Sequence, residues 1–287
     1  MKLKTLALAL AATTIAGSAF AADLPSRKVA PAYAPAPVFT WTGFYVGVNL
    51  GYSFGGSNNG NGFGVVLPPA TVQHIGPLNG GNGSGGGING GLQAGYNWQM
   101  GSLVAGLETD IQLAGIRGSG NPAGAMGLGN NGAAQFVAAN ATSRIDWFGT
   151  LRGRLGFTVA PTFLLYATGG LAYGGVKNSV TPAFVNTTGG SLLGVTTSTN
   201  ATKLGWTVGA GGEYAFSQNW SAKLEYLYTD LGSSTVNLTN AGAAVGGYFA
   251  CCTAYSGQLS NSNRFHTVRA GLNYRFGGAP APVVAKY

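Results

Sequence analysis

The chain has 287 residues, of which 45% are hydrophobic, 11% are aromatic and only 8% are charged, and it contains 50 glycines. So many aromatic side chains argue against a disordered chain, and the lack of an apolar run of about 20 residues after the export signal argues against helical membrane spans. The formal net charge of +8 would suit nucleic acid, but export makes an anionic membrane surface the better expected partner, and no nucleic acid is expected.

The first 21 residues have the features of a signal peptide. Lys2 and Lys4 supply a basic start, an apolar stretch follows, and Ala19-Phe20-Ala21 forms an A-x-A site. We therefore expect cleavage after Ala21. Residues 22–41 are rich in proline and alanine, which predicts an extended tether in the periplasm.

Eight segments with alternating hydrophobicity follow the tether. In the last of them, Val268, Ala270 and Leu272 fall on one face of a strand, and Arg269 and Asn273 fall on the other. One such strand would suit a soluble protein, whereas eight of them with aromatic residues at their ends describe a barrel with an apolar outside and a polar inside. In chain order, the strands are expected at 43–54, 88–99, 103–113, 145–159, 163–174, 204–216, 220–231 and 266–276.

The connections between these segments alternate between long and tight. Long loops are expected near 55–87, 114–143, 176–202 and 232–263, and tight turns near 100–102, 160–162 and 217–219. This rhythm predicts an all-β fold, an eight-stranded antiparallel up-and-down transmembrane β-barrel over 42–276, with long extracellular loops and short periplasmic turns. The charged side chains share one face and the aromatic ones the other, which is the reverse of a soluble barrel. We therefore expect the outer membrane of a Gram-negative bacterium, with the C-terminal tail 277–287 in the periplasm.

Nine charged residues fall on the inward face of the predicted strands. An eight-stranded barrel is just wide enough to be filled by side chains, and an unpaired buried charge is costly. We therefore expect these residues to close the interior as an ionic plug, with a narrow or gated water path as the alternative. They are Glu108, Asp110, Arg152, Arg154, Glu213, Lys223, Glu225, Arg269 and Arg275.

Five bases fall where a predicted strand meets a long loop, at the outer rim of the barrel. We expect them to face lipopolysaccharide, whose phosphates they could pair with, and the alternative is ordinary solvated charge. They are Arg117, Arg144, Lys177, Lys203 and Arg264. Aromatic residues mark two belts of expected interfacial anchors: Trp98, Phe157, Phe163, Phe216, Trp220 and Phe276 near the periplasmic ends, and Trp147, Tyr173, Trp206 and Tyr228 near the outer ends.

Residues that commonly carry chemistry are few. Cys251 and Cys252 are adjacent in a predicted loop, where they could form a vicinal or intermolecular disulfide or remain two small loop residues. His266 lies near the end of the eighth strand, where Asp230 at the end of the seventh could approach it. Such a pair without an activated nucleophile does not make an active site, so we expect neither an enzyme nor a metal site.

The segment Trp41–Tyr52 (WTGFYVGVNLGY) resembles the opening strand of the alphaproteobacterial outer-membrane β-barrel proteins, a family that includes surface antigens and haemin-binding proteins and is often labelled a porin family. Residues 165–174 and 268–276 are similar to its middle and closing strands. The resemblance implies an eight-stranded, OmpA-like barrel whose partners are lipid, lipopolysaccharide and the barrel-assembly machinery. That machinery would read a terminal aromatic residue, either Phe276 or Tyr287.

The resemblance implies a structural role in the envelope together with surface display of the loops. It also allows haemin or host-ligand binding through the extracellular loops, or a small-solute porin, as alternatives. No cofactor is expected for the structural role. Haem ligation would fall on His74, His266, Tyr248, Tyr255 or the cysteine pair, and the sequence selects none of them.

Overall fold

The computed structural model describes residues 39–55, 63–67, 71–74, 85–120, 123–128, 134–186, 191–193, 196–241 and 254–276. Several expected features lie outside this description: the signal peptide, most of the tether, the tail 277–287, Tyr248, Cys251, Cys252, and the side chains of His74 and Tyr255. The described ranges contain no helix that is long and apolar enough to cross a membrane.

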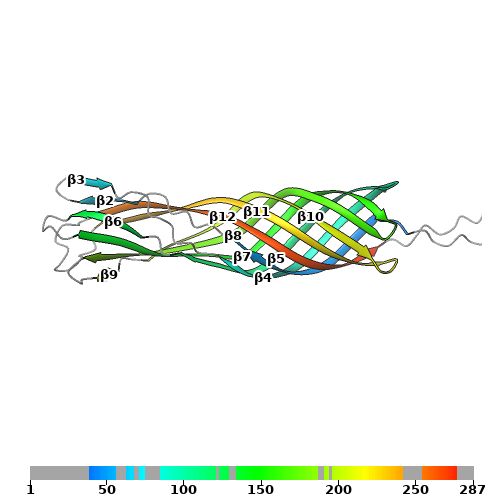
Figure 1. Ribbon diagram of the computed structural model, residues 1–287, viewed down its shortest axis with the longest axis horizontal. Helices are drawn as coiled ribbons and strands as arrows, with labels where there is room; N and C mark the ends of the chain where they lie inside the picture. The colour runs from blue at the N-terminus through cyan, green and yellow to red at the C-terminus, as the bar shows by residue number, and fades with distance from the viewer. Residues whose placement is uncertain are drawn as a thin grey trace, which may run out of the picture. The chain divides into compact units, whose positions relative to one another are not determined.

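Eight long strands form a closed ring (Figure 1). Each pairs antiparallel with its two neighbours, and β1 closes the ring on β12 because Phe44 pairs with Phe276 and Tyr52 with Val268. This confirms the predicted eight-stranded up-and-down barrel. In order around the ring, the strands are β1 (Gly43–Phe54), β4 (Gly86–Met100), β5 (Leu103–Gly120), β7 (Ala134–Ala160), β8 (Phe163–Asn186), β10 (Thr197–Ala215), β11 (Trp220–Ala241) and β12 (Ala254–Phe276).

The barrel has two different ends. At one end, which we call the turn end, tight turns join β4 to β5, β7 to β8 and β10 to β11. Gly101 supplies the left-handed conformation (φ +64°) that the first of these turns requires. At the opposite end, which we call the hairpin end, the strands continue as long antiparallel pairs.

The strand boundaries at the hairpin end differ from the prediction. β7 has 27 residues and β8 has 24, and their pairing continues as far as Gln135 and Asn186. The predicted loops near 114–143, 176–202 and 232–263 are therefore partly strand. Hydrophobic alternation stops at the edge of the apolar band, whereas backbone pairing does not need it. Four short strands also lie at this end: β2 (Phe63–Leu67), β3 (Thr71–His74), β6 (Ala123–Leu128) and β9 (Ser191–Leu193).

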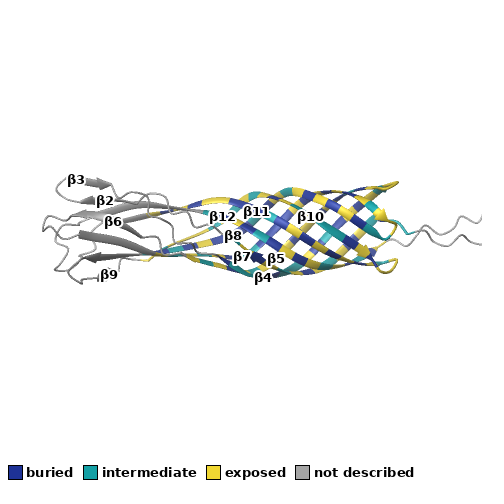
Figure 2. Ribbon diagram, in the orientation of Figure 1, coloured by how far each residue is buried: buried dark blue, intermediate teal, exposed yellow. Residues whose placement is uncertain are grey.

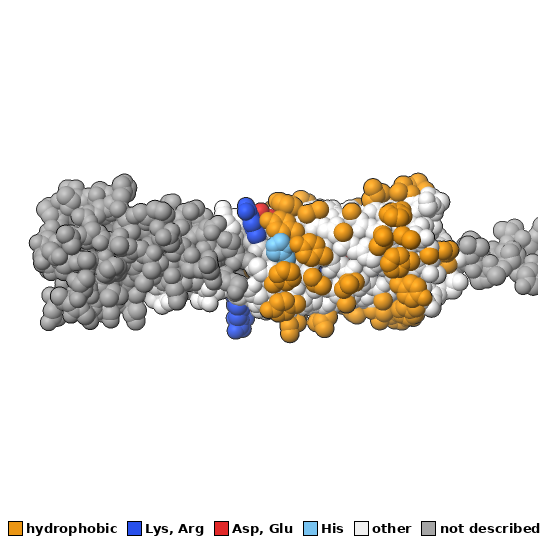
Figure 3. Space-filling model, viewed as in Figure 1, with side chains coloured by type: hydrophobic (Ala, Val, Ile, Leu, Met, Phe, Trp, Pro, Cys, Tyr) orange, Lys and Arg blue, Asp and Glu red, His pale blue; other side chains and the backbone are white. Residues whose placement is uncertain are grey.

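Buried and exposed residues alternate along the strands of the barrel (Figure 2). Leu50 and Leu92 are 64% and 63% exposed, whereas their neighbours Asn49 and Gln93 are buried. On the face shown in Figure 3, outward hydrophobic side chains gather mainly in two belts, and basic side chains lie beyond the belt at the hairpin end. The apolar outside and polar inside match the alternation of the sequence.

The interior is filled in three layers along the strands. Charged and polar side chains make up the central layer. An apolar cluster at the hairpin end, the outer plug, consists of Ile116, Ile145, Phe148, Ala172, Val176, Leu231 and Phe265. A second cluster at the turn end, the inner plug, consists of Trp41, Val104, Leu164, Tyr166 and Ala215, with Phe39 packed against it.

A β-bulge at Asp146 determines which β7 side chains enter the outer plug. Ile145 pairs with Val176 and Trp147 pairs with Gly175 on β8, so Asp146 is an extra residue with no partner on that strand. Because a bulge shifts the alternation, side chains on both sides of it can reach the interior. The Ile145 side chain is buried in the outer plug, and Asp146 turns toward the rim bases.

Residues 39–41 pack into the turn end, although the sequence analysis assigned them to an extended tether. The Trp41 side chain is fully buried, its Nε1 donates to the Pro161 carbonyl at 3.1 Å, and its backbone N–H donates to Gln99 Oε1 at 2.7 Å. The Arg275 guanidinium lies 4.6 Å from the Phe39 ring centroid. Composition could not reveal this boundary, because these residues follow the proline-rich run without a break in the sequence.

Replacing Trp41 with alanine should destabilise the barrel by about 3–5 kcal/mol, the range for removing a buried tryptophan side chain. The measurement is the urea unfolding midpoint in detergent micelles, followed by far-UV circular dichroism. Trp98→Ala is the matched control, because Trp98 faces outward and is 46% exposed, and it should lower the midpoint less. An unchanged midpoint in Trp41→Ala would mean that residues 39–41 do not hold the barrel together.

Candidate functional site

The central layer is an ionic network between strands on opposite walls of the barrel. Glu108 on β5 receives two hydrogen bonds from the Lys223 ammonium on β11, at 2.8 and 2.9 Å. Glu108 also pairs with Arg152, its direct cross-strand neighbour on β7. One carboxylate therefore links three strands and spans the interior.

Two more carboxylates share the same guanidinium groups. Glu225 accepts hydrogen bonds from Arg152 Nη1 at 2.9 Å and from Arg269 Nε at 2.7 Å. Asp110 Oδ2 lies 3.1 Å from Nη2 of Arg152 and 3.1 Å from Nη2 of Arg269. The planar fork of donors on arginine suits this bridging, because one guanidinium can serve two carboxylates.

A separate pair lies nearer the turn end. The Arg154 guanidinium pairs with Glu213 and lies 3.6 Å from the Tyr166 ring centroid, in cation–π contact. The Ser221 hydroxyl donates to Glu213 at 2.6 Å. A hydroxyl and an aromatic face thus complete the surroundings of this buried pair, so neither charge faces an apolar surface alone.

The formal charges of the central layer cancel. Pairing is required here, because a buried charge that loses its partner costs several kcal/mol. The ninth predicted inward residue, Arg275, is also buried, but it lies at the turn end against Phe39 and Trp41. The four carboxylates are Glu108, Asp110, Glu213 and Glu225, and the four cations are Arg152, Arg154, Lys223 and Arg269.

The sequence analysis missed an uncharged part of the interior, which β1, β4 and β12 form. Asn49 Nδ2 donates to Gln93 at 3.0 Å, and Asn89 Nδ2 donates to Ser53 at 2.8 Å. The Ser53 hydroxyl lies 2.7 Å from that of Thr267. The signal was present, because polar residues occupy alternate inward positions of these strands. Amide and hydroxyl groups hydrogen-bond to one another here without any counter-ion, while the amide oxygens of Asn49 and Asn89 are buried without a protein partner.

Three of the five predicted rim bases, Arg117, Arg144 and Lys177, are direct cross-strand neighbours on β5, β7 and β8, and we call them the basic row. Asp146 pairs with Arg144 and, at 2.9 Å, with the Lys177 ammonium. Asp146 lies on the hairpin side of the Trp147 belt, and the hydrogen bond from Lys177 is the main cause that holds its pKa below the ordinary value. The row and Asp146 together keep a net positive charge.

The other two rim bases are held individually by the barrel. Lys203 donates to the Ser233 carbonyl at 3.1 Å. Arg264 pairs at 2.9 Å with Asp230, whose other carboxylate oxygen accepts the Gly232 N–H at 2.7 Å. The structure therefore divides the predicted ring of five bases into a basic row and two separate sites.

Comparisons with known proteins agree with this architecture. A model of the outer membrane protein β-barrel domain matches residues 7–276. The chain belongs to this family. The 31 kDa outer-membrane immunogenic protein of Brucella melitensis is 40% identical over 277 residues, which cover 96% of this chain and 100% of that protein. The 22 kDa outer membrane protein of Rhizobium leguminosarum is 31% identical over 244 residues, which cover 84% of this chain and 80% of that protein. Among solved structures, OprG of Pseudomonas aeruginosa has a TM-score of 0.48 at 11% identity, over 85% of this chain and 100% of that one.

Family membership confirms the outer membrane of a Gram-negative bacterium as the location and gives the barrel its orientation. In outer-membrane barrels, short turns face the periplasm and the longer connections face the outside of the cell. The turn end is therefore the periplasmic end, and the hairpin end is the extracellular end. The basic row accordingly lies at the extracellular rim.

In this outer-membrane barrel, His266 and Asp230 do not form the pair that their positions suggested. Asp230 binds Arg264, whereas His266 Nδ1 lies 2.6 Å from the Tyr226 hydroxyl. The His266 ring stacks on Phe54, with 5.6 Å between the ring centroids. His266 therefore belongs to the lipid-facing aromatic belt near the extracellular end, which is not a setting for general-base chemistry on a soluble substrate.

Among the haem candidates, His266 is the one whose side chain the structure describes, and its Nδ1 lies 2.6 Å from the Tyr226 hydroxyl. Within the described part of the chain, no group of three or more His, Cys, Asp or Glu residues is placed to hold a metal ion. The remaining haem candidates, His74, Tyr248, Tyr255 and the cysteine pair, lie outside the described side chains.

Replacing Glu225 with alanine should destabilise the barrel strongly, because it removes a carboxylate that Arg152 and Arg269 share. We expect a loss of about 3–5 kcal/mol, as for other broken buried ion pairs. Urea unfolding and the heat-induced shift in gel mobility measure it. Asp146→Ala breaks solvent-exposed pairs with two bases of the basic row at the rim and should cost far less, because exposed ion pairs contribute little to stability. Equal losses in the two variants would contradict a structural role for the network.

Proposed function

We propose that this protein is a closed, structural barrel that stabilises the outer membrane and displays its extracellular hairpins at the cell surface. The observation that carries the proposal is the filling of the interior by a neutral ionic network between two apolar plugs. Enzymatic activity is not part of the proposal, because His266 and Asp230 are bound to different partners.

The layered interior supports a closed barrel because each layer resists an ion for a different reason. For an ion to pass, the packed apolar side chains of the plugs would have to separate, and the charge pairs of the network would have to break. At the extracellular mouth, a pocket beside Ile116, Asn263 and Phe265 has a volume of about 30 Å³, which leaves space for only a few water molecules. Such an interior favours a structural role over the small-solute porin alternative.

The strand extensions support surface display. β11 and β12 stay paired from Asp230 and Arg264 at the rim as far as Ala241 and Ala254. These extensions therefore present an ordered hydrogen-bonded backbone beyond the membrane band. The Brucella relatives are named outer-membrane immunogenic proteins, which is consistent with surface exposure of this protein.

Purified protein in planar bilayers should show no stable channel openings, because ions find no continuous aqueous path. A variant in which alanine replaces Trp41, Phe148 and Phe265 removes the largest side chains of both plugs and leaves the ionic network in place. That variant should also stay silent, because the network still fills the centre of the barrel, with the heat-induced gel shift reporting that it has folded and an open porin in the same bilayers reporting the sensitivity of the assay. Discrete openings of the wild-type protein would contradict the closed barrel and favour the porin alternative.

Surface display predicts asymmetric labelling of intact cells. In a background where serine replaces Cys251 and Cys252, Asn140→Cys on β7 should react with a membrane-impermeant maleimide, because Asn140 is exposed beyond the extracellular rim. Ser217→Cys is the matched control, since Ser217 is exposed in the turn between β10 and β11, and it should react only after the cells are permeabilised. Labelling of Ser217→Cys alone would overturn the proposed orientation.

A further inference from the structure

The basic row places like charges directly opposite one another on neighbouring strands. Arg117 pairs in register with Arg144, and Arg144 pairs in register with Lys177. Like charges in direct cross-strand positions repel, so such a row is unfavourable without an anion beside it. Asp146 compensates part of the positive charge of Arg144 and Lys177. Among the described side chains, no acid contacts Arg117. The row therefore has capacity for another anionic group.

Aromatic side chains mark the membrane boundary directly below this row. Trp147 and Tyr173 on β7 and β8 form an edge-to-face pair, with 6.2 Å between their ring centroids. Large amphipathic rings of this kind lie at the level of the lipid head groups. The basic row is thus at the height of the phosphates of the outer leaflet.

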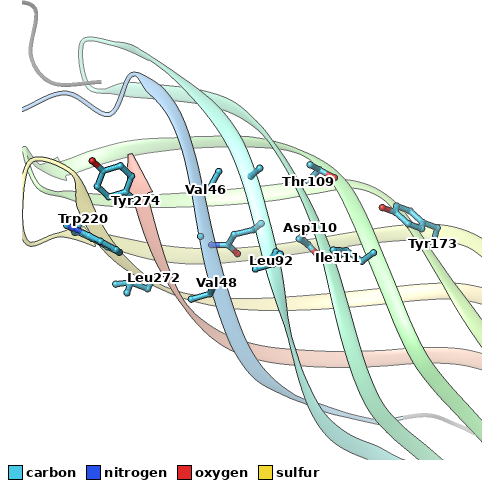
Figure 4. Close-up of a pocket in the computed structure, with 13 residues that line it drawn as sticks. Val46, Val48, Leu92, Thr109, Asp110, Ile111, Tyr173, Trp220, Leu272 and Tyr274 are labelled. Atoms are coloured by element: carbon cyan, nitrogen blue, oxygen red, sulfur yellow. The ribbon is translucent and has the colours of Figure 1, made fainter. Parts of the chain in front are cut away.

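An apolar groove on the lipid-facing wall begins at Tyr173 on β8 and Ile111 on β5, on the periplasmic side of the basic row (Figure 4). Its volume is about 780 Å³, and it runs obliquely across the barrel from Tyr173 past Ile111 and Thr109 toward Trp220 near the periplasmic end. Most of its lining is apolar and comes from outward side chains of β1, β4, β5 and β12. The groove therefore has the chemistry to take a hydrocarbon chain.

The strand register connects the groove to the basic row. Ile111, Gly149 and Tyr173 are cross-strand neighbours on β5, β7 and β8, the strands that carry the row. A Cβ atom on Gly149 would lie 2.6 Å from the Tyr173 ring, so glycine lets this ring lie over β7 toward Ile111. Four residues of β8 separate Tyr173 from Lys177, or about 13 Å along the strand. Row, aromatic pair and groove thus follow one another down the same wall.

We propose that this wall binds the lipid A part of lipopolysaccharide, with a phosphate on the basic row and an acyl chain in the groove. Guanidinium groups bind phosphate through two parallel hydrogen bonds, which Arg117 and Arg144 can both supply. A phosphorylated and acylated glycolipid of the outer leaflet meets both requirements at the observed height. The proposal rests on the location of the barrel in the outer membrane and does not depend on whether its interior is closed.

The test is a titration of the folded, lipopolysaccharide-free barrel in detergent micelles with bisphosphorylated lipid A, followed by native mass spectrometry. Replacing Arg117, Arg144 and Lys177 together with glutamine should weaken binding about 125-fold, at about fivefold for each of the three bases removed. Lys203→Gln with Arg264→Gln is the control, because these bases bind Ser233 and Asp230 instead, and it should change binding less than about threefold. Equal effects of the two sets would overturn the proposal.

A second arm tests the groove without changing any charge. Thr109→Phe places a ring in the groove and should weaken lipid A binding, whereas Ala210→Phe, on the exposed outer face of β10 and away from the groove, should not. Unchanged lipid A binding in Thr109→Phe would contradict the assignment of the groove as the acyl-chain site. Lipid A without phosphates should bind as weakly as bisphosphorylated lipid A binds to the triple variant. If phosphatidylglycerol bound as tightly and lost as much affinity in the triple variant, the assignment to lipid A would be wrong.

Discussion

Closure of eight strands into one narrow ring is the constraint on which the rest of this structure depends. In such a ring every second side chain points into the interior, which is only wide enough for the side chains themselves. A charge at the centre of that space needs an opposite charge within reach, and Lys223 therefore meets Glu108 across the interior. The same confinement lets apolar residues fill both ends, where Trp41 and Phe265 are almost fully buried. Charge pairing in the middle and apolar packing at the ends thus both result from the narrow interior of the barrel.

The sequence predicted the faces of the strands well and the partners across the interior poorly. A period of two is a local property, so it identified Arg152 and Glu225 as inward residues without any knowledge of the fold. Which carboxylate meets which base depends on the order and stagger of the strands, which no local pattern encodes. The inner plug was missed for a similar reason, because Trp41 becomes a core residue only when the turn after β7 offers it the Pro161 carbonyl. The strand extensions were missed because pairing beyond the membrane band needs no hydrophobic alternation.

The bulge at Asp146 shows how one irregular residue serves both sides of the barrel wall. Strict alternation could not bury both Ile145 and Phe148, and the extra residue between Ile145 and Trp147 removes that conflict. A carboxylate turned into the outer plug would have no partner there, whereas at the rim Asp146 meets Arg144 and Lys177. The irregularity thus completes the apolar plug and keeps an acid out of it. Bulges are common at barrel rims, where they redirect side chains in this way.

Arginine serves opposite purposes on the two faces of β7. Arg152 faces inward and is shared by Glu108, Asp110 and Glu225, so its charge is used entirely within the protein. Arg144 faces outward at the rim, where water and ions stabilise a charge that the protein leaves only partly paired. A buried layer cannot keep a net charge at reasonable cost, but a rim can. Any charged ligand of this barrel is therefore expected outside the ring, where the net charge of the described rim is concentrated on β5, β7 and β8.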